Sequence, residues 1–125
     1  MTEETEGLSA AALAVLGEIN GAIEHFINHG EGKTIFLNKM ALSQDEQGMI
    51  RDFLGQGSVK ITLDNTAEPA EWQESGVSGV WFGVFLNQSG KPLLETIEIG
   101  AFPLVAGAQA EDMMHDGQLL LERLT

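Results

Sequence analysis

The sequence predicts an α+β fold, with a small mixed or antiparallel sheet of about four to five strands and three helices packed mainly on one face. Helix-period and strand-period apolar patterns alternate along the chain. A helix-capping motif stands near the middle, and two β-rich runs are joined by a short polar loop. With 125 residues and no long linker, residues 1–125 are expected to form a single domain.

The first helix is expected from Leu8 to His29, where apolar residues recur at intervals of three and four. Gly30 is placed to take the left-handed conformation that ends a helix. A short strand, Thr34 to Asn38, follows. Because residues 35–37 are all apolar, this strand is expected to be covered on both faces.

A second helix is expected to begin near Gln44. Ser43 and Glu46 match a capping box, in which the hydroxyl accepts from the amide three residues on and the carboxylate accepts from the Ser amide. Gly55 is placed to end this helix. Its inward-facing side chains are predicted to be Met49, Ile50, Phe53 and Leu54.

The remaining pattern is mostly strand. Residues 59–63 alternate apolar and polar side chains, and Ala70 to Ser75 can add a strand. Val80 to Leu86 and Leu93 to Ile99 then read as a hairpin around residues 87–90. Residues 34–64 are interpreted as a strand-helix-strand segment that would form a right-handed parallel crossover. A third helix, from about Ala110, closes the chain.

Acidic charge is concentrated at the two ends of the chain. Nineteen Asp and Glu against six Lys and Arg give a net charge of −13. Residues 1–31 carry six acids and no Lys or Arg, and residues 92–125 carry six acids against Arg123 alone. Such a surface repels polyanions, so we expect no nucleic-acid partner and no anionic membrane partner.

The absence of cysteine excludes disulfides, thiolate catalysis and cysteine-ligated metal or iron–sulfur sites within this chain. Acidic residues precede the first apolar run, unlike the basic region of a signal peptide. The longest stretch of low polarity, Leu8 to Gly17, is shorter than the roughly 20 residues of a membrane helix. We therefore expect a cytoplasmic protein.

Few residues suggest catalysis or metal binding. His25 and His29 have the spacing of two metal ligands on one helix, but two ligands do not complete a site, and a solvated polar face is the alternative. Glu95 and Glu98 lie three apart on a strand and so point to opposite faces, which excludes an acid/base pair. We expect no enzyme activity and no cofactor.

Both faces of the predicted hairpin are apolar. Trp81 and Phe85 fall on one face and Phe82 on the other, with Trp72 upstream. Two interpretations remain open for the Trp face: it packs beneath other parts of the chain, or it is an exposed surface for a protein partner.

Three motifs resemble a known family when taken in order. They are Leu54-Gly55-Gln56-Gly57-Ser58-Val59, then the run from Glu74 to Trp81 that ends in Gly-Val-Trp, then Glu95-Thr96-Ile97-Glu98-Ile99 before Pro103. Together they resemble the C-terminal conserved region of the HupH/HyaF hydrogenase expression/formation proteins, over roughly residues 35–124.

The resemblance implies a non-enzymatic, chaperone-like role in maturation of the nickel–iron uptake hydrogenase, linked to iron–sulfur assembly of its small subunit. The expected partner is a hydrogenase subunit or another hydrogenase accessory protein. The matched motifs make Trp81, Glu74, Glu95 and Glu98 candidate partner-binding residues, and the physical argument adds Trp72 and Phe85. Two alternatives stay open: a nickel-binding module using His25 and His29, and an acidic domain of unrelated role that forms a homodimer.

Overall fold

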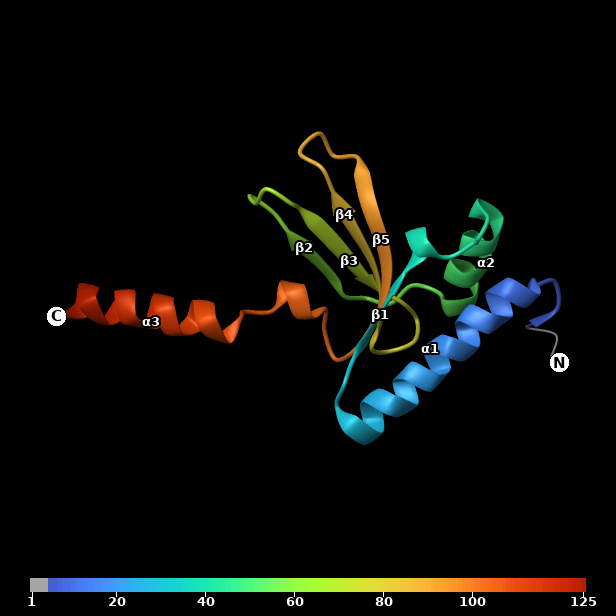
Figure 1. Ribbon diagram of the computed structural model, residues 1–125, viewed down its shortest axis with the longest axis horizontal. Coiled ribbons are helices and arrows are strands. Elements are labelled where there is room, and N and C mark those ends of the chain that lie inside the picture. The colour runs from blue at the N-terminus through green and yellow to red at the C-terminus, as the bar shows by residue number, and fades with distance from the viewer. Residues whose placement is uncertain (1–4) are drawn as a thin grey trace.

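The computed structural model describes residues 5–125 as one five-stranded antiparallel sheet with three α-helices (Figure 1). The strand order is β1-β5-β4-β3-β2. The helices are α1 (Ala10–His29), α2 (Gln44–Leu54) and α3 (Ala110–Leu124), and short 3-10 turns lie at Leu37–Lys39 and Leu104–Ala106. The strands are β1 (Lys33–Phe36), β2 (Lys60–Leu63), β3 (Ala70–Glu74), β4 (Val80–Leu86) and β5 (Pro92–Ile99). The predicted α+β class is confirmed.

Local signals for the helix ends are confirmed. Gly30 ends α1 with φ of 74°, in the left-handed region. Ser43 and Glu46 form the capping box of α2, with the Ser43 amide donating to Glu46 Oε1 at 3.0 Å and the Glu46 amide donating to Ser43 Oγ at 3.1 Å. Gly55 ends α2 with φ of 76°.

Glu46 also joins the beginnings of two helices. Ser9 caps α1 by accepting from the Ala12 amide at 3.0 Å, and its hydroxyl donates to Glu46 Oε2 at 2.5 Å. The Ser9 bond, followed by the bond from the Ser43 amide, lowers the pKa of Glu46 below 4.5. One carboxylate therefore orients α1 relative to α2.

Helices α1 and α2 cover one face of the sheet (Figure 1). Val15 and Ile19 of α1 and Ile50 and Leu54 of α2 share a core with strand residues that point to this face, Ile35, Val80, Phe82, Ile97 and Ile99. Of the inward residues predicted for α2, Phe53 is exposed instead, because the helix buries only the narrow side that carries Ile50 and Leu54.

The predicted parallel crossover is wrong. β1 pairs only with β5, and β2 pairs only with β3, so the two strands lie at opposite edges of the sheet. The hairpin strands β4 and β5 supply the longest apolar runs and lie inside the sheet, and β3 lies inside it because it pairs with β4 on one side and β2 on the other.

Two further expectations require correction. As an edge strand, β1 buries only Ile35, and Leu37 reaches the core because the chain turns into a 3-10 helix there. The third helix forms as predicted but does not pack on the sheet: α3 buries no residue and projects away from the body (Figure 1). Its apolar side chains therefore remain in solvent.

By length and composition α1 is long and apolar enough to span a membrane. The expectation of no membrane helix was based on the shorter stretch from Leu8 to Gly17. The core helix of a soluble protein meets the same criterion. In this structure Ala12, Val15, Ile19 and Ala22 of α1 are buried in the fold.

Replacing Glu46 by Gln tests the link between the helices. Because the pKa of Glu46 is lowered on folding, its carboxylate adds stability above pH 4.5 and loses it as pH falls through the lower folded pKa. Denaturant unfolding should show Glu46→Gln less stable than wild type at pH 7, with the difference shrinking below pH 4.5. Glu122→Gln on exposed α3 is the control, and an equal effect there would contradict the assignment.

Candidate protein-contact groove

The two tryptophans lie together in a second core, on the sheet face opposite α1 and α2, so the Trp face packs within the chain. Trp72 is 0% exposed and Trp81 is 3% exposed, and both pack with Ala70. Phe85 is half-buried and meets the Trp72 ring edge-on, with centroids 5.6 Å apart. Ala106, from the 3-10 turn at Leu104–Ala106, packs against this cluster. Of the three predicted aromatic contact residues, only Phe85 therefore reaches the surface.

Glu98 is the acidic residue of this second core. It is 9% exposed, and its Oε2 accepts from Trp72 Nε1 at 2.6 Å and from Thr96 Oγ1 at 2.9 Å. Gly83 makes room for the group: a Cβ there would lie 2.8 Å from Glu98 Oε2 and 2.9 Å from Trp72 Cδ1. Glu98 therefore acts within the fold, as a hydrogen-bond acceptor that fixes the orientation of Trp72.

The other two predicted carboxylates lie apart from Glu98. Glu74 Oε2 accepts from the Gly79 amide at 3.0 Å and holds the turn before β4. Glu95 opposes Val84 in the sheet and therefore points to the helix side, whereas Glu98 opposes Trp81. The prediction that Glu95 and Glu98 occupy opposite faces is confirmed, so the six candidates do not form one site.

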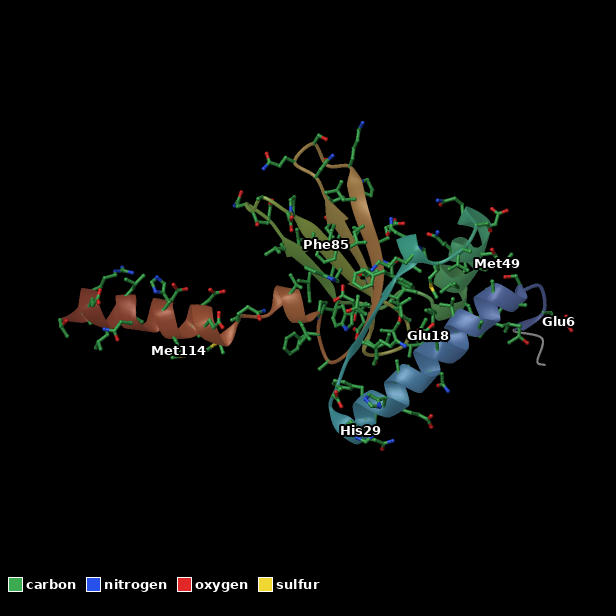
Figure 2. All side chains as sticks on the ribbon, viewed as in Figure 1. Glu6, Glu18, His29, Met49, Phe85 and Met114 are labelled. Atoms are coloured by element: carbon green, nitrogen blue, oxygen red, sulfur yellow. The ribbon has the colours of Figure 1, made fainter. Side chains whose placement is uncertain are left out.

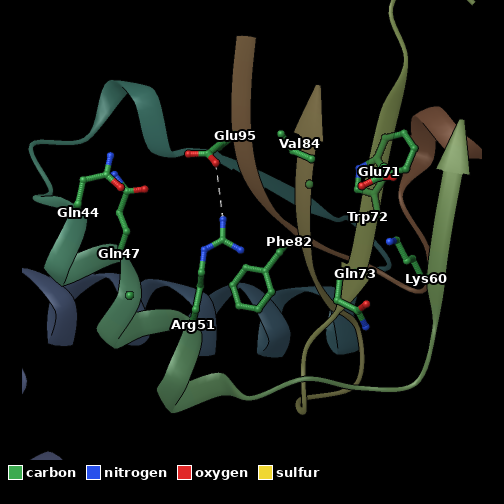
Figure 3. Close-up of a pocket in the computed structure, with 12 residues that line it drawn as sticks. Gln44, Gln47, Arg51, Lys60, Glu71, Trp72, Gln73, Phe82, Val84 and Glu95 are labelled. Atoms are coloured by element: carbon green, nitrogen blue, oxygen red, sulfur yellow. Dashed lines mark ion pairs between the residues drawn. The ribbon is translucent and has the colours of Figure 1, made fainter. Parts of the chain in front are cut away.

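A polar groove lies between α2 and strands β2 to β5, on the part of the sheet that the helices leave open (Figure 3). Its volume is about 470 Å³. Arg51 dominates it: the guanidinium carbon lies 4.9 Å from the centre of the Phe82 ring, and Nη2 lies 3.9 Å from Glu95 Oε1. The residues that line the groove are Gln44, Gln47, Gly48, Arg51, Lys60, Glu71, Trp72, Gln73, Phe82, Gly83, Val84 and Glu95.

Two of the predicted contact residues, Trp72 and Glu95, line this groove (Figure 3). Trp72 is fully buried, so Glu95 is the one of the two that a partner can reach. The others that line it were not predicted, although the sequence holds a signal for them. Gln44, Gln47, Gly48 and Arg51 follow the spacing i, i+3, i+4, i+7, which places a polar stripe along one side of α2. That stripe faces the sheet across the groove, while the apolar side of α2 faces the core.

His25 and His29 stack at the end of α1, with ring centres 4.6 Å apart. His25 Nε2 lies 3.5 Å from Glu31 Oε1, and the pair is exposed to solvent. Within residues 5–125, no group of three or more His, Asp or Glu side chains is arranged to hold a metal ion. The nickel-binding alternative therefore gains no support from this geometry.

The bond from Trp72 to Glu98 is tested by Trp72→Phe, which keeps an aromatic ring but leaves the buried carboxylate without its indole donor. We expect a loss of about 1–3 kcal/mol in the free energy of unfolding. Trp81→Phe is the matched control, since Trp81 Nε1 donates only to the neutral Gly100 carbonyl, at 3.1 Å. Equal losses in urea unfolding would contradict the role given to Glu98.

Comparison with known proteins supplies the family. A solved structure described as hydrogenase expression protein HupH from Thiobacillus denitrificans ATCC 25259 superposes with a TM-score of 0.84 at 28% sequence identity. The superposition covers 93% of this chain and 96% of that chain. The search of curated proteins gives no significant match.

A family profile extends the resemblance seen in the three motifs. Residues 9–125 match the family described as HupH hydrogenase expression protein, C-terminal conserved region. The match therefore begins at the cap of α1, ahead of the first motif, and includes the groove and α3. The chain belongs to the HupH hydrogenase expression protein family.

Proposed function

We propose that this protein is a non-enzymatic accessory factor in hydrogenase maturation, and that it works by binding a hydrogenase subunit in the groove between α2 and the sheet. The family match over residues 9–125 carries the proposal. The preferred partner is the small subunit before or during assembly of its iron–sulfur clusters, a role that fits a chaperone in the cytoplasm.

The chemistry of the groove suits a peptide segment better than a small substrate. Gln44 and Gln47 each offer an amide that can both donate and accept, as the backbone of an extended peptide requires. The Gln73 amide nitrogen already donates to backbone carbonyls of the protein, which leaves its oxygen as an acceptor. Phe82 gives the groove an apolar floor beneath the Arg51 guanidinium.

Charge in the groove differs from charge elsewhere on the chain. Arg51 and Lys60, two of the six Lys and Arg residues, lie in the groove with Glu71 and Glu95. The groove is thus locally balanced on a chain of net charge −13. A peptide segment that carries both charges can therefore bind in the groove without net electrostatic repulsion. The rest of the acidic surface would repel an acidic segment.

Purified hydrogenase small and large subunits, each immobilised, provide the direct test of binding. Arg51→Glu should weaken binding about tenfold or more, because it reverses the central charge of the groove and faces Glu95. Lys39→Glu is the matched control, since Lys39 also lies over an aromatic ring, Phe36, at 5.0 Å but is not part of the groove lining.

The two parts of the proposal fail in different ways. Wild-type protein that binds neither subunit would contradict the partner. Equal binding by the Arg51 and Lys39 variants would keep the partner but contradict the groove. Circular dichroism of each variant confirms that the fold is retained.

A further inference from the structure

Exposed apolar side chains are concentrated at the C-terminal end of the chain. Of fifteen large hydrophobic residues that are exposed in the described part, nine lie within residues 102–124. On α3 their exposure runs from 45% to 77%, and Figure 2 shows Met114 on the projecting helix, away from the body. The exposed residues of the segment are Phe102, Leu104, Val105, Met113, Met114, Leu119, Leu120, Leu121 and Leu124.

An unpaired helix of this kind is unfavourable in water. Isolated helices of about 12–15 residues are marginal in water. Helix α3 has 15 residues, and Gly117 at its centre has a lower helix propensity than Ala. Because α3 buries no residue against the part of the chain that the structure describes, packing against another surface would stabilise it.

The apolar pattern of α3 is symmetric about Gly117. Apolar residues stand three, four and seven positions away on both sides, and at 100° per residue all of them fall within about 60° of the Gly117 direction. They are Ala110, Met113 and Met114 before Gly117, and Leu120, Leu121 and Leu124 after it. We call this set the α3 stripe. A contact between two identical copies requires such a self-complementary surface.

We propose that the protein forms a homodimer in which the α3 stripes of two copies pack antiparallel, with Gly117 at the two-fold axis. This inference is independent of the hydrogenase. Gly117 has no atom within 4 Å of the position that a Cβ would take, so a second helix can approach there closely.

Charges at the ends of α3 favour the antiparallel direction. Its first turn holds Glu111 and Asp112 and is acidic, whereas its last turn holds Arg123 beside Glu122 and has no net charge. Antiparallel packing sets each last turn beside the first turn of the other copy and opposes the two helix dipoles. Parallel packing would place Glu111 and Asp112 against their own copies.

The overall charge of −13 per copy does not prevent this arrangement. At 1.5 Å per residue α3 is about 22 Å long, and antiparallel packing leaves the two folded bodies at its opposite ends. That separation exceeds the screening length of about 8 Å at physiological ionic strength.

The interface can extend beyond the helix pair. Antiparallel packing brings Leu124 of one copy level with Ala110 of the other, close to the 3-10 turn, where Leu104 and Val105 are exposed. A pair of 15-residue helices alone is small beside the roughly 1,200–2,000 Å² of a stable interface, and this turn adds apolar area at both ends.

Light scattering of the full chain tests the homodimer. At micromolar concentrations we expect twice the 13.4 kDa chain mass. A double variant, Met114→Glu with Leu120→Glu, should be a monomer that keeps the near-ultraviolet spectrum of the buried tryptophans. Leu119→Glu, on the opposite side of α3, is the matched control and should remain a dimer.

Three outcomes would overturn the proposal. A wild-type monomer at every concentration would leave the α3 stripe to a different protein. A double variant that stays dimeric would place the interface elsewhere. A monomeric Leu119→Glu would show that the contact is not confined to the stripe.

Single cysteines test the direction of packing, because the chain has none of its own. Helices pack about 8–10 Å apart and their Cα atoms lie about 2.3 Å from each axis, so facing Cα atoms at the dyad come within about 3.4–5.4 Å. Oxidation should therefore crosslink Gly117→Cys, which meets its own copy within disulfide reach. Leu124→Cys should not crosslink, and efficient crosslinking at position 124 would overturn the antiparallel arrangement.

Discussion

The sheet is apolar on both faces, but the helices of the described chain cover only one of them. The fold therefore depends on how the other face is buried. Helices α1 and α2 cover the face of Phe82 and Ile97. The other face is closed by Trp72 and Trp81, and the Trp72 indole is held by a 2.6 Å hydrogen bond to the buried Glu98. A buried carboxylate is costly unless it is hydrogen-bonded, so Trp72, Thr96 and the space above Gly83 are required together. Glu98, the next-to-last residue of β5, is thus a structural requirement of the aromatic face.

Closure of both faces determines where other molecules can bind. The tryptophans are buried within the chain, so the two surfaces proposed for contact lie outside the aromatic cluster. One is the polar groove beside α2, where Arg51 lies over Phe82. The other is the α3 stripe, which leaves the body entirely (Figure 1). The two surfaces differ in chemistry, because the groove is polar and charge-balanced whereas the stripe is apolar. A dimer through α3 would leave the groove of each copy free for a subunit.

Sequence patterns predicted those parts of the fold that local chemistry determines. The capping box at Ser43, the helix end at Gly30 and the central hairpin all depend on neighbours within a few residues, and all are confirmed. The place of β1 and β2 at opposite edges depends on contacts distant in sequence, which local periodicity does not encode. For the same reason the pattern of α3 predicted a helix but not that it packs against no other element among residues 5–125. The sequence shows the polar side of α2 that lines the groove. It does not show that Phe82 and Glu95 lie opposite that side, because this depends on the fold.

Hydrogen–deuterium exchange on the whole chain, with and without the purified hydrogenase small subunit, tests most directly that binding occurs beside the core and not on the aromatic face. We predict slower exchange on binding in α2 and in β2 and β3, which border the groove, and no change in the turn of residues 100–107 that closes the aromatic face. Protection confined to that turn, with α2 unchanged, would contradict the assignment of the groove as the binding surface.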